Sequence, residues 1–168
     1  MSHLTTGNTL GFLLTDTARL FRQFFEKNVT ENGLGLTPGE IRALANTVRF
    51  RGSRQAVLAE RMGVEPMTLS SYLDRLESRG LVARTVDPAD RRAKLVEPTD
   101  AAFDILDQLD PLFEDVYLQA THGLEEAQVD AMSASLRIIR ANLTNDHGLL
   151  AEMNILSRQN GTPGDKAD

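Results

Sequence analysis

The chain has 168 residues, of which 41% are hydrophobic and 25% charged, and its formal net charge is −6. This length suits one domain with a hydrophobic core, and no apolar run approaches the roughly 20 residues of a membrane-spanning helix. There are no cysteines, which excludes disulfides, thiolate metal ligands and cysteine nucleophiles. Because the N-terminus lacks the pattern of a secretory signal, we expect a cytoplasmic protein with no membrane partner.

The charges are unevenly distributed along the chain. Ten basic and six acidic residues lie between Arg49 and Lys94, whereas the rest of the chain holds eight basic and eighteen acidic residues. A basic middle within acidic flanks is typical of a local anion-binding face. Arginines on solvated helices would give the same count, so charge alone leaves both interpretations open.

The first predicted helix runs from about Thr9 to Val29 and ends before Asn32-Gly33 and Gly35. Its apolar face is broader than a helix packed on one side needs, which indicates contact with a partner subunit. That face consists of Leu10, Leu13, Leu14, Leu20, Phe21, Phe24 and Phe25. A second helix begins at Thr37-Pro38-Gly39-Glu40, which has the hydroxyl, proline and glutamate of a capped helix start.

Two short helices are predicted over residues 54–62 and 66–79. Ser53 is placed to cap the first helix, Gly63 ends it in a left-handed conformation, and Pro66 opens the second. Leu69, Leu73 and Leu76 recur at helical spacing and define the buried stripe of the second helix. Two short helices joined by a tight turn that contains glycine form a helix-turn-helix.

The hydrophobic period changes after Gly80. Residues 81–86 and 93–96 are predicted to be paired strands joined by the turn-rich stretch 87–92. A helix-turn-helix followed by a β-hairpin is a winged helix. The predicted fold is therefore mainly α with a small β-hairpin wing.

Two longer helices are predicted beyond the wing. One runs from Thr99 to about Thr121 and should be kinked by Pro111, which removes a backbone hydrogen bond. The other runs from Glu125 to about Asn145. A further helical segment is predicted over 148–156, followed by a disordered tail over 159–168.

Several stretches of this chain resemble the MarR family of bacterial winged-helix transcription regulators. They are GLTPGEIRAL, LAERMGVEPMTLSSYLDRLESRGLVAR, DPADRRAKLVEPT and GLEEAQVDAM, and the resemblance covers roughly residues 10–145. It implies a homodimer whose terminal helices interleave, a pseudo-palindromic double-stranded DNA operator, and release by a small aromatic or anionic ligand. It divides the chain into an N-terminal dimerisation helix (1–36), a winged DNA-binding lobe (37–98), C-terminal dimerisation helices (99–158) and the tail.

The helix over 66–79 is predicted to be the recognition helix in the major groove. At about 100° per residue, its exposed face is mostly small and hydroxylic, so that it can approach base edges and phosphates. The predicted DNA-contacting residues on it are Pro66, Met67, Thr68, Ser70, Ser71 and Arg75. Ser71 stands where many family members carry arginine, so we expect sequence reading to depend more on Thr68, Ser70, Arg75 and the wing.

The wing arginines are predicted to contact DNA. The family's Asp-x-Arg motif falls on Asp90 and Arg92, so Arg92 is the residue expected to enter the minor groove. Arg91 is expected to contact a phosphate, and a salt bridge from Asp90 is expected to hold the Arg92 guanidinium. The alternative is that Asp90 and Arg92 only stabilise the turn, although an exposed pair contributes only about 0–1 kcal/mol.

Two other functions were weighed against DNA binding. A winged helix can serve protein–protein contact alone, and this remains the alternative interpretation. Catalysis is disfavoured because the three histidines, at 3, 122 and 147, show no triad or metal-ligand spacing. We expect no cofactor and no metal, and no residue of an effector pocket is assigned from the sequence.

Overall fold

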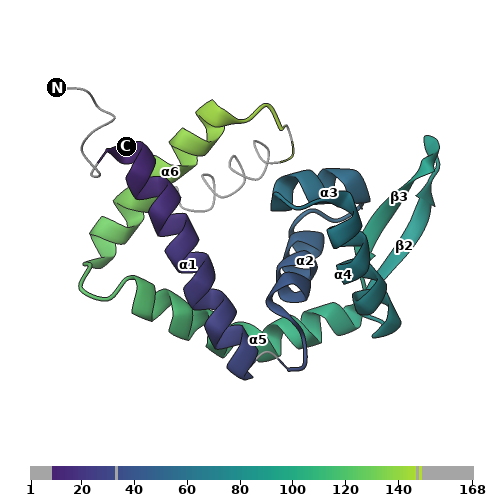
Figure 1. Cartoon of the computed structure of the whole chain (residues 1–168), viewed down its shortest axis with the longest axis horizontal. Helices are drawn as coiled ribbons and strands as arrows, with labels where there is room; N and C mark the ends of the chain where they lie inside the picture. Colours follow the sequence, from purple (N-terminus) through teal and green to yellow (C-terminus); the bar gives the residue numbers. More distant parts are fainter. Residues whose placement is uncertain (1–8, 33, 147, 149–168) are drawn as a thin grey trace, which may run out of the picture. The chain divides into compact units, whose positions relative to one another are not determined.

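The structure is a computed structural model that describes residues 9–32, 34–146 and 148. Its elements are shown in Figure 1: α1 (Leu10–Asn32), α2 (Pro38–Arg49), β1 (Ser53–Arg54), α3 (Gln55–Met62), α4 (Pro66–Ser78), β2 (Val82–Asp87), β3 (Asp90–Pro98), α5 (Asp100–Ala120) and α6 (Glu126–Leu143). The predicted mainly α fold with a β-hairpin wing is confirmed. Except for Gly148, the predicted segment 148–156 and the tail 159–168 lie outside the described residues.

The helices of the lobe begin and end at local signals. The Thr37 hydroxyl accepts from the Glu40 amide at 3.3 Å, and the Glu40 carboxylate accepts from the Thr37 amide at 2.7 Å, which is the predicted capping box. Helix α3 ends at Gly63 with φ of 62°, and Pro66 opens α4. The prediction that Ser53 caps α3 is wrong. Ser53 pairs with Val96 in the sheet, which leaves Arg54 as the cap residue.

The sheet has three antiparallel strands in the order β1-β3-β2. Val82 faces Pro98 and the pairing continues to Val86 opposite Lys94, after which Asp87 pairs directly with Asp90. The hairpin turn is therefore only Pro88-Ala89, and residues 91–93 form an unpaired bulge on β3. The prediction of a loop over 87–92 with a strand from residue 93 is thus corrected, because β3 already begins at Asp90. Figure 1 shows this hairpin extending beyond α3 and α4.

The core of the lobe lies between α2, α3, α4 and the sheet. The predicted leucine stripe of α4 is completely buried. It packs with buried side chains of the neighbouring elements: Ile41, Leu44, Leu58, Met62, Leu81, Val82 and Val96. Gly39 lets α2 approach α4 closely, because a Cβ atom at this position would meet the Tyr72 ring at 2.3 Å. Helix α4 is therefore fixed on the lobe by its whole inner face.

Helices α1 and α5 contact each other through a separate apolar cluster. Phe25 stacks on Phe113 with ring centroids 5.9 Å apart, and Val29, Leu109 and Val116 are buried near them. Helix α5 continues through Pro111. The N-terminal part of α1 instead exposes large apolar side chains, with exposed fractions near one half: Leu10, Phe12, Leu13, Leu20 and Phe21.

The chain divides into two compact units between Ala120 and Thr121. In the second unit, α6 begins at Glu125 with a capping box and has no buried residue. Its exposed apolar side chains are Met132, Leu136, Ile138 and Leu143. Within the described residues, none of the helices combines the length and the apolar character that crossing a membrane requires.

Candidate nucleic-acid interface

The outer face of α4 presents most of the side chains predicted from its periodicity. Met67 is 84% exposed, and Pro66, Ser71 and Arg75 are also exposed. Thr68 and Ser70 are half-buried, one on each flank of the helix. Small side chains around one long apolar residue leave a face that can enter a major groove without steric conflict.

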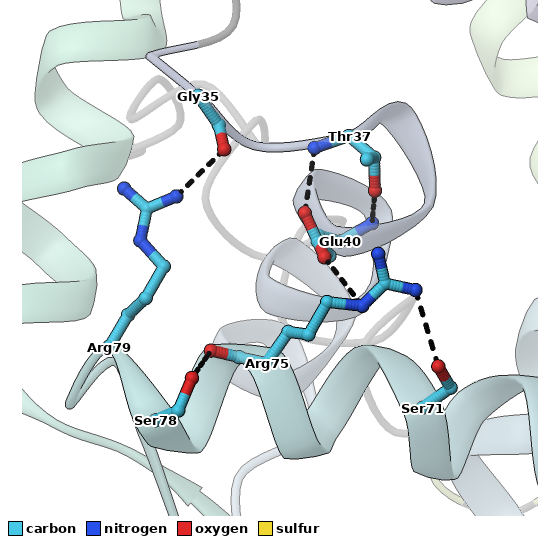
Figure 2. Close-up of polar contacts among 7 residues, drawn as sticks. All are labelled: Gly35, Thr37, Glu40, Ser71, Arg75, Ser78 and Arg79. Atoms are coloured by element: carbon cyan, nitrogen blue, oxygen red, sulfur yellow. Dashed lines mark hydrogen bonds and ion pairs between the residues drawn. The ribbon is translucent and has the colours of Figure 1, made fainter.

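Arg75 contacts the helix-turn-helix itself as well as solvent (Figure 2). Its Nε lies 3.2 Å from the Glu40 carboxylate, whose side chain is only 5% exposed, and its Nη2 donates to the Ser71 hydroxyl at 3.2 Å. The same Glu40 carboxylate closes the capping box of α2. Arg75 therefore connects α4 to the start of α2, a contact that the sequence did not reveal.

Arg79, at the C-terminal end of α4, contacts the loop that leads into α2. Its guanidinium donates to the Gly35 carbonyl at 3.0 Å and to the Leu34 carbonyl at 3.3 Å. Leu34 has a φ of 53°, a left-handed conformation that is uncommon for leucine, and Gly35 follows with 73°. Arg79 thus fixes an unusual turn between α1 and α2 (Figure 2).

Arg84 joins α4 to the wing strand β2. Its side chain is 10% exposed. The Arg84 Nη2 atom lies 2.7 Å from the Asp74 carboxylate, and Nε and Nη2 both donate to the Oε2 atom of Glu77. The Glu77 carboxylate also accepts from the Arg84 backbone amide at 3.2 Å. Hydrogen bonding to Arg84 lowers the pKa of Glu77, and the reciprocal contact raises the pKa of Arg84. Helix α4 and the wing are therefore connected by charge as well as by packing.

The predicted salt bridge between Asp90 and Arg92 is absent from the described part of the chain. The Asp90 carboxylate instead accepts from the backbone amide of Arg92 at 3.1 Å. A backbone amide beside the turn already has a fixed position, whereas ordering the long guanidinium costs rotamer entropy, so the local Asp-to-backbone contact prevails. The side chains of Arg91 and Arg92 remain exposed on the bulge of β3.

A second aspartate, Asp87, fixes the turn of the wing hairpin. Asp87 is 6% exposed, and one carboxylate oxygen accepts from the Ala89 amide at 2.8 Å. The other oxygen accepts from Arg54 Nε at 2.7 Å. The hydrogen bond from Ala89 contributes most to holding the pKa of Asp87 below its usual range, and Arg54 lowers it further.

A groove of about 500 Å³ lies between the start of α4 and the wing. Its lining includes four cationic side chains and one carboxylate, and small residues form much of the rest. The lining residues are Arg54, Gln55, Ala56, Pro66, Ser70, Arg84, Asp90, Arg92, Ala93 and Lys94. The structure thus brings Pro66 and Ser70 of the predicted helix face together with Asp90 and Arg92 of the predicted wing in one basic groove.

A family model described as the MarR family matches residues 34–93, which run from the turn before α2 to the bulge of β3. Residues 34–93, which hold the winged helix, are therefore similar to the MarR family. Solved structures with this fold agree over most of the chain. A MarR-family transcriptional regulator from Silicibacter pomeroyi is 29% identical, with a TM-score of 0.67, over 82% of this chain and 91% of its own.

Two further solved structures are similar to this chain. A transcriptional regulator from Rhodococcus sp. RHA1 is 26% identical, with a TM-score of 0.68, over 80% of this chain and 94% of its own. CouR from Rhodococcus jostii RHA1, solved bound to p-coumaroyl-CoA, is 25% identical, with a TM-score of 0.63, over 79% of this chain and 92% of its own.

Three charged residues that line the groove were not predicted from the sequence: Arg54, Arg84 and Lys94. Only the basic count of the central segment indicated them. Their contribution depends on pairing across strands and between helices, which the local pattern does not contain. Over the described residues, no cluster of histidine and carboxylate side chains suits a metal ion.

Acid should weaken the winged lobe through Asp87 and Glu77. Their folded-state pKa values are lowered, so their stabilising contribution is complete above the usual carboxyl range of about pH 4 and is lost as pH falls through the folded values. We expect the melting temperature to fall steeply below about pH 4. The amount by which Asp87→Asn melts below wild type should shrink over the same range. Thermal melts from pH 7 to 3 test this, and a deficit that grows on acidification would contradict it.

Proposed function

We propose that this chain is a homodimeric, sequence-specific DNA-binding transcription regulator. Helix α4 enters the major groove, and wing residues 87–92 reach the minor groove. The observation that carries this proposal is the basic groove between α4 and the wing, where four cations face one carboxylate. The two relatives that are named transcriptional regulators, at 26% and 29% identity, support the same function.

Each predicted contact has a chemical role in this proposal. On α4, Thr68, Ser70 and Ser71 offer hydroxyls to bases or phosphates, and Met67 offers an apolar surface to a thymine methyl. On the wing, Arg92 enters the minor groove and Arg91 contacts a phosphate. Among the described residues, neither guanidinium has an ion-pair partner, so neither must break a contact to bind DNA.

The dimer follows from the apolar side chains that the two units leave exposed. Leu20, Phe21 and Phe24 of α1 border a pocket of about 340 Å³ together with Gln119 and Ala120. Burial of such side chains contributes about 1.5–3 kcal/mol each. We expect sedimentation at micromolar concentration to show a dimer, and Phe21→Asp to shift it toward an unstable monomer. A well-folded wild-type monomer would contradict this.

We further propose that the regulator is a repressor that a small aromatic or anionic ligand releases. CouR, with its bound p-coumaroyl-CoA, supports a ligand of this kind. Arg42 of α2 is a candidate contact: burial and the nearby Arg22 of α1 lower its pKa, and Glu26 of α1 offsets this effect in part. Its guanidinium also donates to the Met62 carbonyl at 3.0 Å, which connects it to the end of α3.

Selection of DNA from a random pool tests the function. The wild-type protein should enrich a pseudo-palindromic sequence, and fluorescence anisotropy with that sequence should show tight binding that weakens steeply with salt. Enrichment of no sequence, together with no salt-dependent binding to any duplex, would favour the alternative of a protein–protein module.

A further inference from the structure

Arg54 lines the basic groove at the point where β1, α3 and the wing strands meet. It ends β1, where it pairs with Leu95 of β3, and it is the cap residue of α3. Its Nε donates to Asp87 at the end of β2. One residue therefore connects the helix-turn-helix to both strands of the wing, to β3 through its backbone and to β2 through its side chain.

The contact to Asp87 uses only part of the Arg54 guanidinium. One Asp87 oxygen accepts a hydrogen bond from Nε and the other accepts one from the Ala89 amide, so both oxygens of this nearly buried carboxylate have a partner. The Arg54 side chain is 44% exposed and lines the groove. Within the described residues, no acceptor contacts its two terminal nitrogens, so they can donate to a ligand while Nε keeps its partner.

The course of DNA through the winged helix determines what that ligand is. The major and minor grooves of a duplex are separated by a sugar–phosphate backbone. If α4 occupies one groove and the wing the next, as the proposed function requires, that backbone must pass between them. The space between them is the basic groove of about 500 Å³.

Two of the other cations of this groove, Arg84 and Arg92, are less suited to receive the phosphate. Arg84 is nearly buried and already pairs with Asp74 and Glu77. Arg92 is assigned to the minor groove. We propose that Arg54 contacts the backbone phosphate that lies between α4 and the wing, and that it simultaneously holds the wing through Asp87. Arg54 is thus both a DNA contact and a positioning residue, and this inference rests on the proposed function.

Salt-dependent binding of the selected DNA separates the two roles. Affinity is measured between 50 and 200 mM salt for wild type, Arg54→Ala, Arg54→Gln, Asp87→Asn and the control Lys27→Ala. Lys27 is exposed on α1, so its loss removes one positive charge outside the groove. Glutamine at position 54 can still donate to Asp87 but has no charge. The Arg54→Gln variant therefore replaces Arg54→Ala in the comparison if thermal melts show that Arg54→Ala is poorly folded.

Each lost phosphate contact should reduce the slope of log affinity against log salt by about 0.9, or about 1.8 for a dimer. We expect this reduction for Arg54→Ala and Arg54→Gln, with about 10-fold weaker binding per contact at 0.1 M salt. Lys27→Ala should keep the wild-type slope. Asp87→Asn should bind several-fold more weakly at an unchanged slope, although removing a negative charge alone would tighten binding.

Three results would overturn the inference. A wild-type slope in both Arg54 variants would show that Arg54 touches no phosphate, even if their affinity falls. Tighter binding by Asp87→Asn would show that the ion pair does not position the wing. Absence of DNA binding by the wild type would instead refute the proposed function, and the phosphate contact with it.

Discussion

Arg92→Ala should weaken operator binding more than any other single change in the wing, by about 1–3 kcal/mol. Arg92 lies on the bulge of β3 and lines the basic groove. A narrow minor groove attracts such a guanidinium strongly. The melting temperature should hardly change, because the side chain makes no ion pair within the described residues. Anisotropy at fixed salt, with a melt recorded alongside, measures both quantities.

Variants of Asp90 show how Arg92 is held. Because Asp90 accepts from the Arg92 backbone amide, Asp90→Asn should retain the contact and bind DNA at least as well as wild type. Asp90→Ala should lose part of the affinity. If Asp90 acts only through Arg92, adding Asp90→Ala to Arg92→Ala should cost nothing further. Wild-type affinity in Arg92→Ala, or unfolding of that variant, would mean that the wing is structural.

Arg75→Ala should reduce both stability and DNA binding. Its loss leaves the nearly buried Glu40 carboxylate without a cation, which should lower the free energy of unfolding by about 1–3 kcal/mol. Loss of a base contact should weaken operator binding by about 1–3 kcal/mol. If Arg75 instead contacts a phosphate, its loss should weaken binding to all DNA sequences alike and reduce the salt slope by about 0.9. Chemical denaturation and anisotropy test the two effects.

The double variant Glu40→Gln/Arg75→Ala separates the two effects. Glutamine can still accept from the Thr37 amide in the capping box, and it removes the charge that Arg75 neutralises. Stability should therefore recover in part, whereas DNA affinity should stay low. Full recovery of affinity would show that Arg75 supports the lobe without touching DNA.

Much of the fold could be predicted because its signals are local. The capping box of Thr37 and Glu40 spans four residues, and the turn from Gly63 to Pro66 is equally short. The leucine stripe of α4 follows from helical periodicity alone. The bulge on β3 could not be predicted, because the register of the hairpin depends on how Asp87 closes the Pro88-Ala89 turn.

The site was predictable in its outline but not in its contacts. Exposure of Met67 and Ser71 follows from the position of the leucine stripe. The carboxylate partners of Arg54 and Arg75 are Asp87 and Glu40. Each lies more than 30 residues away in sequence from its arginine, and only packing brings them together. Asp90 and Arg92 are near neighbours, yet the sequence offered two donors, the amide and the guanidinium, and the ordered amide is the one that binds.

A footprint on the selected DNA tests the central claim most directly. If α4 of each subunit occupies a major groove, two half-sites should be protected with their centres about 10 bp apart, and each should be flanked by minor-groove protection from the wing. Arg92→Ala should remove the flanking protection and leave the centres in place. A single half-site, or a footprint that Arg92→Ala leaves unchanged, would contradict the proposed mode of binding.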